Sequence, residues 1–300
     1  MDILRWLGLA LISIHFAWAA DSHNIFRYDA TQPFNLEEKS VEPHDLIVVH
    51  DIRFNDVAGQ SINGYLIVPQ GKGPFAAILY VHWLGDPETS NRTQFLKEAE
   101  EVCQQGAAAL LIDMPWSVSG WFQNRKMDDD YAFSIRQVQN LQRALDFLLQ
   151  RPGIDRKRVA YVGHDFGATF GAILVGIDPR IKHAVFMAGT PILSDWFLLG
   201  SKIQGDEREA YIKKITPLDP INFIGKAKSV PMLLQFSSHD QFIPKEKAEL
   251  FGNSAHDPKD FRWYDSGHEM NAQAASDRVA WLESQLNIAP KASGQLPDQK

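Results

Sequence analysis

The feature that most constrains the fold of this chain is a strand–turn–helix pattern over residues 158–172. Val159–Val162 has the β-branched and aromatic composition of a short buried strand. Gly163-His164-Asp165-Phe166-Gly167 follows at once and precedes a stretch of small residues with helical character. Glycines on both sides of such a turn leave room for the strand and the helix, while the central residue takes a strained backbone conformation. We expect this strain to lift the Asp165 side chain above a sheet edge.

The remaining chain alternates strands with helices after an antiparallel start. Leu46–Phe54 and Ser61–Pro69 are expected to pair as a hairpin. From residue 75 to residue 286, apolar runs alternate with segments whose apolar residues recur at helical spacing. We therefore predict an α/β fold with a doubly wound, mostly parallel sheet and an antiparallel start. A chain of 300 residues with 45% hydrophobic composition is sufficient for one such domain.

The N-terminus differs in composition from the rest. Arg5 precedes a short apolar run that ends in small residues, which predicts a signal peptide cut near Ala19 or Ala20 and a secreted or periplasmic protein. An uncleaved anchor and a buried N-terminal helix stay open as alternatives. The predicted segments are a signal peptide at 1–20, a polar surface arm at 21–43, the α/β domain at 44–288 with a lid-like insertion at 190–229, and a loose tail at 289–300.

Composition limits the partners. The formal net charge is −7 and no run of Lys or Arg forms a basic stripe, which argues against nucleic acid and anionic membranes. Cys103 is the only cysteine, so neither an intrachain disulfide nor a cysteine metal cluster is available. We expect a small-molecule substrate, no cofactor, no metal and no stable membrane association after signal cleavage. The oligomeric state does not follow from the sequence.

Two further candidate side chains follow predicted strands. Asp240 comes directly after the strand at 230–237, and His268 follows the strand at 261–264. Because the carboxyl ends of parallel strands meet at one edge of a sheet, both are expected near Asp165. Asp165, Asp240 and His268 are the predicted catalytic residues, with Asp195 and Asp219 as rivals of Asp240.

The loop after the strand at 75–82 supplies the remaining candidates. Its position suits backbone N–H groups that stabilise an oxyanion, and we predict that Trp83 or Leu84 acts with the N–H of Phe166. His82 and His164 are expected to shape the loop through hydrogen bonds. The side chains predicted to contact the substrate or its leaving group are His82, Trp196 and Tyr211.

The turn Gly163–Gly167, followed along the chain by an acid and a histidine, resembles the nucleophile elbow and triad order of the α/β-hydrolase superfamily. The resemblance covers roughly residues 45–287 and implies the α/β-hydrolase fold. Arg151–Asp155, which leads into the elbow, resembles dienelactone hydrolases and prolyl oligopeptidase-like enzymes, which have Cys or Ser at the position of Asp165. The elbow itself resembles those of epoxide hydrolases and haloalkane dehalogenases, which use Asp.

Two departures separate the chain from the aspartate enzymes. Epoxide hydrolases typically have two tyrosines in the cap, whereas residues 190–229 contain only Tyr211. Haloalkane dehalogenases often have Trp directly after the nucleophile, where this chain has Phe166. The resemblance therefore implies the fold more specifically than the substrate.

An aspartate at this turn favours a particular chemistry. Its carboxylate is ionised at neutral pH, with an unperturbed pKa of ~3.9, and needs no base for attack. Attack on an ester carbonyl would give a mixed anhydride, whereas attack on an sp³ carbon of a halide or epoxide gives a stable alkyl ester. His268 would then activate the water that hydrolyses that ester. The alternative is an esterase-like member of the fold in which Asp replaces Ser, leaving weak activity or a non-catalytic binding protein.

Overall fold

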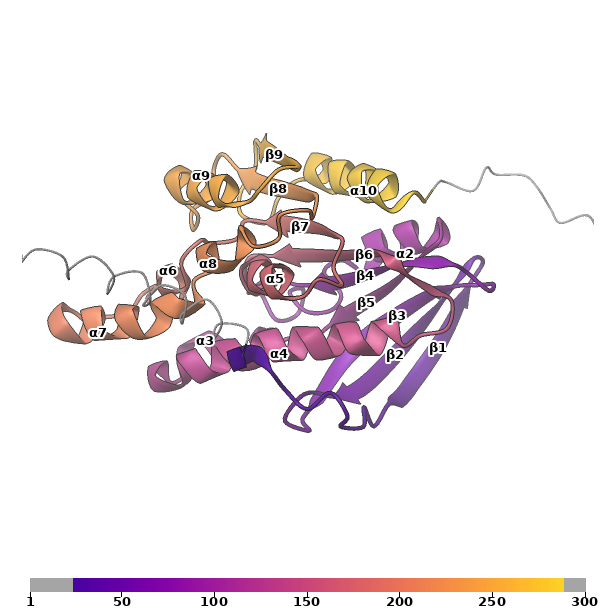
Figure 1. Cartoon of the computed structure of the whole chain (residues 1–300), viewed down its shortest axis with the longest axis horizontal. Helices are drawn as coiled ribbons and strands as arrows, with labels where there is room; N and C mark the ends of the chain where they lie inside the picture. Colours follow the sequence, from indigo (N-terminus) through magenta and orange to yellow (C-terminus); the bar gives the residue numbers. More distant parts are fainter. Residues whose placement is uncertain (1–23, 289–300) are drawn as a thin grey trace, which may run out of the picture.

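The computed structural model describes residues 24–288, which form one nine-stranded sheet with helices on both faces (Figure 1). The strand order is β1-β2-β3-β5-β4-β6-β7-β8-β9. The strands are β1 (Glu37–His44), β2 (Ile47–Asn55), β3 (Ser61–Pro69), β4 (Phe75–Val81), β5 (Ala107–Ile112), β6 (Ile154–His164), β7 (His183–Met187), β8 (Met232–Ser237) and β9 (Lys259–Tyr264). The α-helices are α2 (Leu96–Gln104), α3 (Trp121–Asn124), α4 (Asp130–Leu149), α5 (Phe166–Ile177), α6 (Leu193–Phe197), α7 (Gly205–Ile215), α8 (Ile221–Ile224), α9 (Lys245–Ser254) and α10 (Ala272–Leu286).

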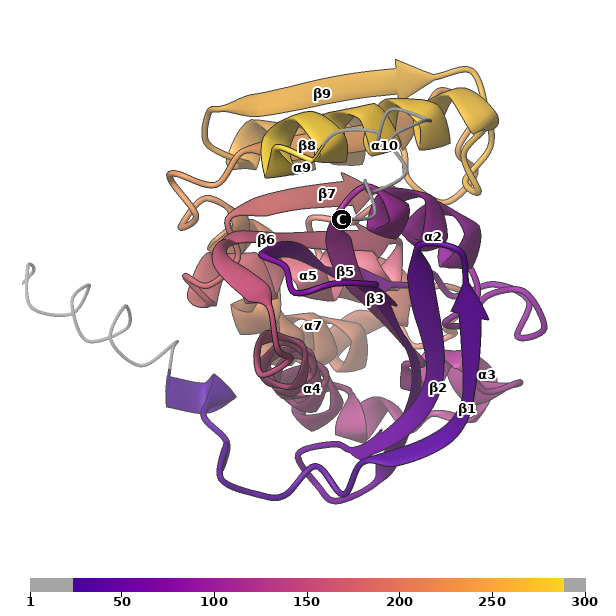
Figure 2. The same cartoon turned by 90° about the vertical axis from the view of Figure 1, so that its right-hand side faces the viewer.

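The centre of the sheet is buried on both faces, as β4 illustrates. Ala77, Leu79 and Val81 face the core formed with α4 and α5, while Ile78 and Tyr80 face the core formed with α2 and α10. Alternate residues of a strand point to opposite faces, so a strand covered on both sides reads as one continuous apolar run. Strands from β5 to β9 in the sheet order are parallel, and β1, β2 and β3 join them antiparallel (Figure 2). The predicted doubly wound sheet with an antiparallel start is confirmed.

The N-terminal part of the described chain departs from the prediction. Residues 21–43 were expected to be a surface arm, and the structure instead has β1 paired antiparallel with β2 over most of its length. Every residue of β1 is exposed, and the strand reads Glu-Glu-Lys-Ser-Val-Glu-Pro-His. An edge strand that buries no face shows no alternation of apolar residues, and its charges and proline oppose pairing with other chains. The expected signal peptide and the tail at 289–300 lie outside the described residues.

The insertion at 190–229 contains three short helices, α6, α7 and α8, of which α6 and α7 lie on the left in Figure 1. A buried polar cluster joins α7 to α4. The hydroxyl of Tyr211 donates to Asp130 at 2.6 Å, and Arg125 lies 3.3 Å from the other oxygen of the same carboxylate. Arg125 also donates to the carbonyl oxygen of Phe197 at the end of α6. These contacts fix the insertion over the domain.

Three further observations concern residues 24–288. No helix in this range is long and apolar enough to cross a membrane. No group of three or more His, Cys, Asp or Glu side chains in it is arranged to hold a metal ion. Cys103 lies buried in α2 as a free thiol.

Candidate active site

The turn between β6 and α5 has the strained geometry expected from its sequence. Asp165 has φ 54° and ψ −111°, a conformation that L-residues adopt rarely. A Cβ on Gly167 would lie 2.3 Å from the carbonyl oxygen of Val81, and one on Gly163 would lie 2.5 Å from the backbone of Gly167. Only glycine fits at both positions, because the start of α5 passes directly against β4 and β6. The turn therefore presents Asp165 at the carboxyl edge of the sheet.

The two oxygens of the Asp165 carboxylate have different surroundings. Oδ2 accepts a hydrogen bond of 2.9 Å from the backbone N–H of Leu84, and the nearby N–H of Phe166 also lowers the pKa of the carboxyl group. Oδ1 is buried and has no hydrogen-bond partner among the described residues. The residue as a whole is 1% exposed. One oxygen thus already occupies an oxyanion-binding position while the other has its lone pairs free.

Trp83, one of the two loop residues predicted to donate to an oxyanion, is placed differently. Its N–H donates to Oε1 of Gln94 at 2.9 Å and so does not reach Asp165. Its indole ring instead stacks on the imidazole of His164, with ring centres 5.1 Å apart. The backbone turns between Trp83 and Leu84, so their N–H groups point in different directions and only that of Leu84 reaches the Asp165 carboxylate.

The second half of the site joins the loops after β8 and β9. His268 Nδ1 lies 2.8 Å from Oδ2 of Asp240, and both side chains are buried. The other oxygen of Asp240 accepts the backbone N–H groups of Phe242 and Ile243, at 2.8 and 3.0 Å. Asp240 is thereby oriented by its own loop, and it fixes the imidazole so that Nδ1 carries a proton and Nε2 points away from Asp240.

The two rivals of Asp240 have other partners. Asp195 forms an ion pair of 2.7 Å with Lys247. Asp219 accepts the backbone N–H of Leu193 at 2.8 Å, which holds the start of α6. The structure gives neither of them a contact with the histidine.

Three buried polar atoms at the site have no partner within residues 24–288: Asp165 Oδ1, His268 Nε2 and Trp196 Nε1. The ring of Trp196 lies 5.8 Å from the imidazole of His268 and 5.6 Å from the ring of Phe166, measured between ring centres. Burying an unpaired polar group is unfavourable, so each of these atoms can gain a hydrogen bond with a water or substrate molecule that enters the site. Here one acceptor, one base and one donor are kept free in the same aromatic enclosure.

Burial and neighbouring charges shift the pKa values of this group in opposite directions. Burial raises the pKa of Asp165 to about 7, although His268 and the two backbone N–H groups oppose the shift. Burial lowers the pKa of His268, but the hydrogen bond to Asp240 and the charges of Asp165 and Asp240 outweigh burial and raise it. Asp240 has a lowered pKa, because its hydrogen bonds to His268 and the backbone exceed the effect of burial. Asp165 and His268 each favour the charged form of the other, so their titrations are coupled.

Two side chains predicted to contact the substrate are committed elsewhere. Nε2 of His82 accepts a hydrogen bond of 3.0 Å from the backbone N–H of Met114. Nδ1 of His82 lies 2.8 Å from the carbonyl oxygen of Trp83. Burial lowers the pKa of His82 to about 4, which suits this loop-shaping role. The hydroxyl of Tyr211 is used by Asp130, so it points to the base of the insertion and not to Asp165. Of the three candidates, only Trp196 contacts the site.

Sequence reasoning missed Gln94. Its Oε1 accepts the N–H of Trp83, and its Nε2 donates to Nδ1 of His164 at 2.7 Å. His164 then donates from Nε2 to the backbone carbonyl of His268 at 2.9 Å. This chain of hydrogen bonds connects the oxyanion loop, the elbow and the histidine loop. No motif marks Gln94, because its two partners lie at the ends of two separate strands, β4 and β6.

The strained turn, the acid–histidine pair from later strands and the N–H groups of the earlier loop define an α/β-hydrolase site on an α/β-hydrolase fold. Within that superfamily, residues 41–213 match the family described as "Esterase FrsA-like". The match covers more than half of the chain, so the chain belongs to the FrsA-like esterase family. It includes the elbow and ends before Asp240 and His268.

Individual relatives agree with this assignment. The chain is 26% identical over 234 residues to Esterase FrsA from Klebsiella pneumoniae subsp. pneumoniae, which covers 70% of this chain and 53% of the relative. It is 27% identical over 309 residues to Esterase FrsA from Escherichia fergusonii, covering 91% of this chain and 70% of the relative. The chain thus spans about half the length of the first of these curated relatives.

Solved structures share the fold. An acetyl xylan esterase from Paenibacillus sp. R4 matches with a TM-score of 0.73 at 18% identity, covering 94% of this chain and 97% of that one. Acetyl xylan esterase 1 from Thermoanaerobacterium sp. JW/SL YS485 matches with a TM-score of 0.71 at 16% identity, covering 89% and 93%. At these identities the likeness concerns the fold alone.

Proposed function

We propose that the protein is a hydrolase in which Asp165 attacks a small substrate at an sp³ carbon, and in which His268, oriented by Asp240, activates the water that releases the product. The observation that carries this proposal is that the two oxygens of the Asp165 carboxylate have different hydrogen-bond surroundings. Oδ2 is held by the N–H group of Leu84, while Oδ1 and His268 Nε2 are buried without partners among the described residues. A serine-type site requires its histidine to bond the nucleophile, and here that bond is absent among the described residues.

The first step needs no proton transfer to the nucleophile. Oδ1 of ionised Asp165 forms a bond to the substrate carbon, the carbon–halogen or carbon–oxygen bond breaks, and its electron pair leaves with the halide or the epoxide oxygen. The unpartnered N–H of Trp196 beside Phe166 is the donor best placed to stabilise that developing negative charge. The product of this step is an alkyl ester of Asp165.

The second step hydrolyses that ester. His268 Nε2 takes a proton from water while the oxygen attacks Cγ of Asp165, and the negative charge develops on Oδ2. Oδ2 is the atom that already accepts the N–H of Leu84. Collapse of the tetrahedral intermediate releases the alcohol, which takes the proton from His268, and leaves Asp165 as a carboxylic acid with one oxygen from water. Loss of its proton, to solvent after a halide leaves or to the alkoxide of an opened epoxide, restores the carboxylate.

The charges of the site support this order of events. The negative charge of Asp165 contributes to the raised pKa of His268. Conversion of Asp165 to a neutral ester removes that charge, so the pKa of His268 falls and the imidazole becomes an available base. The first step thus prepares the base that the second step needs.

A second candidate function is ester hydrolysis, weak or absent because an aspartate occupies the nucleophile position, with substrate binding as the remaining role. Membership of the FrsA-like esterase family and the likeness to acetyl xylan esterase folds favour it. Carboxylate attack on an acyl carbon gives an anhydride that reverts readily, so this candidate predicts no stable alkyl adduct.

The deciding experiment is intact-mass spectrometry of the His268→Gln variant after incubation with epoxides, haloalkanes and esters. We expect a stable adduct of alkyl mass that maps to Asp165, because the first step proceeds and the second lacks its base. His239→Gln is the matched control: His239 is exposed and pairs with Asp265 outside the site, so this variant should turn over normally.

A single turnover of wild-type protein in ¹⁸O-labelled water provides an independent measurement. The label should enter the Asp165 carboxylate, since the alcohol product takes its oxygen from Asp165. Label that appears only in the product would show that water attacks the substrate directly and would overturn the covalent scheme. Ester turnover in wild-type protein without any adduct in the variant would favour the second candidate.

A further inference from the structure

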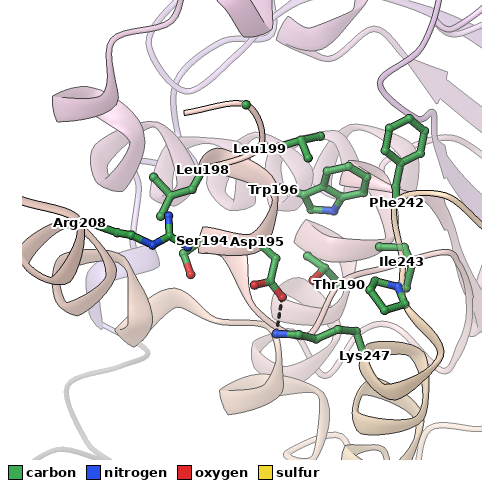
Figure 3. A pocket seen from close by; sticks show the side chains of 12 residues that line it. Thr190, Ser194, Asp195, Trp196, Leu198, Leu199, Arg208, Phe242, Ile243 and Lys247 are labelled. Atoms are coloured by element: carbon green, nitrogen blue, oxygen red, sulfur yellow. Dashed lines mark ion pairs between the residues drawn. The ribbon is translucent and has the colours of Figure 1, made fainter. Parts of the chain in front are cut away.

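A cavity of about 320 Å³ lies beside the candidate site, between the insertion and the loop after β8 (Figure 3). Its walls come from α6, α7, the loop at 238–244 and α9. The side chains that matter for its chemistry are Asp195, Trp196, Leu198, Arg208, Phe242 and Lys247. Neither Asp165 nor His268 lines the cavity, so it is separate from the reacting atoms in this structure.

One aromatic layer separates the cavity from those atoms. Trp196 and Phe242 line the cavity, and both also contact the imidazole of His268, with ring centres 5.8 and 5.1 Å away. The two aromatic rings lie 5.9 Å from each other. Phe242 is 41% exposed and stands on a loop, so it is the less constrained member of the layer. Phe242 is therefore the side chain of this layer that can move most easily to connect the cavity with His268.

The cavity has an excess of positive charge. Arg208 and Lys247 each carry one positive charge, and Asp195 offsets Lys247 through an ion pair of 2.7 Å, drawn as the dashed line in Figure 3. Within residues 24–288 no carboxylate pairs with Arg208. In Figure 3 its side chain extends from α7 towards the part of the cavity that Ser194 lines. A guanidinium beside a hydroxyl matches the planar, doubly accepting carboxylate group.

We propose that this cavity binds the part of the substrate remote from the reacting carbon, and that this part ends in a carboxylate held by Arg208. Leu198, Leu199 and Trp196 provide apolar wall for a short hydrocarbon linker. The assignment of the bound molecule as a substrate rests on the proposed function; the carboxylate site itself does not. The substrate class is then a short aliphatic acid with its reactive carbon at the opposite end from the carboxylate.

The test measures binding without turnover. Titration calorimetry with hexanoate and with hexanamide compares two ligands that differ in charge and share the chain. We expect hexanoate to bind wild-type protein about tenfold more tightly, the size of one charge-assisted hydrogen bond. Arg208→Gln should remove this preference, and Lys213→Gln, an exposed residue on the same helix, should retain it.

A third variant moves the affinity in the opposite direction. Asp195→Asn releases Lys247 from its ion pair, so hexanoate should bind more tightly than to wild-type protein while hexanamide binds equally. Equal affinity for the two ligands in wild-type protein, or a preference that survives Arg208→Gln, would overturn the carboxylate site. An alkyl adduct on Asp165 in the His268→Gln protein would still support the proposed function in that case, so the two failures are distinguishable.

Discussion

At the scale of single residues, the site depends on atoms that hold the reacting groups as much as on the reacting groups themselves. In the proposed mechanism, Asp165 attacks with one oxygen because Leu84 holds the other, and His268 presents Nε2 because Asp240 occupies Nδ1. Gln94 hydrogen-bonds none of these four residues directly and positions two of their loops instead. It bonds Trp83 and His164, and so connects the loop that carries Leu84 with the loop that carries His268.

Gln94→Leu removes both of these hydrogen bonds at nearly constant volume. It leaves the Trp83 N–H and the His164 ring nitrogen without partners in a largely buried region, so we expect the free energy of unfolding to fall by about 1–3 kcal/mol. Misplacement of the oxyanion loop should also lower kcat by about tenfold or more with little change in KM. Steady-state kinetics on a substrate identified by the adduct screen, together with urea unfolding, measure the two effects.

Gln105→Leu is the control for this variant. Gln105 lies just after α2 and donates to Glu283 in α10, and no hydrogen bond or ion pair within residues 24–288 links this pair to Asp165, Asp240 or His268. It should lose stability without losing kcat. If Gln94→Leu behaves in the same way as Gln105→Leu, the glutamine has a structural role only and the connection to His268 is wrong.

At the scale of elements, a buried contact between α7 and α4 is among those that position the insertion. The sequence predicts Tyr211 as a leaving-group donor, but in the structure its hydroxyl donates a hydrogen bond to Asp130. Burial raises the pKa of Asp130, and the hydrogen bond from Tyr211 opposes that shift by stabilising the carboxylate. The contact therefore stabilises the insertion as a unit and has no direct part in the chemistry.

Tyr211→Phe distinguishes these two roles. Loss of the hydroxyl leaves Asp130 with Arg125 as its remaining partner, so we expect a loss of about 1–3 kcal/mol in the free energy of unfolding. The rate of adduct formation in a Tyr211→Phe/His268→Gln double variant should stay within about twofold of the single variant, because the leaving group does not meet Tyr211. A loss of adduct formation with unchanged stability would restore Tyr211 as the donor.

At the scale of the whole molecule, the sequence predicts what depends on periodicity and chain order. The β4 strand was visible because both of its faces are buried, and Asp165, Asp240 and His268 were visible because each follows a strand that ends at the same edge. β1 was not visible, because an edge strand exposed on every residue carries no apolar pattern. The roles of Trp83 and Tyr211 were not visible either. Their hydrogen bonds go to Gln94 and Asp130, and no local pattern determines which side chain a fold brings next to a given donor.

The buried carboxylate of Asp165 also affects the stability of the whole molecule. Its pKa is about 7 in the folded protein and near 3.8 when exposed, so between these values the folded state keeps a proton that the unfolded state releases. The free energy of unfolding therefore falls as the pH rises through this window, by on the order of a few kcal/mol. Asp165→Asn carries no such charge and should be more stable than wild type, by a margin that grows from pH 4 to about pH 7.

The same window governs activity with the opposite sign, because only the ionised carboxylate attacks. Wild-type kcat/KM should rise with pH through about 7 while the unfolding midpoint falls, and Asp165→Asn should be inactive at every pH. Because the titrations of Asp165 and His268 are coupled, the midpoint of each pH profile, for kcat/KM and for stability, reports on both groups together and not on Asp165 alone. Asp265→Asn, which removes an exposed carboxylate in the loop before His268, controls for the general effect of one charge. A stability difference between Asp165→Asn and wild type that does not change with pH would show that the carboxylate is not held at a raised pKa. The activity profile would then need another titrating group.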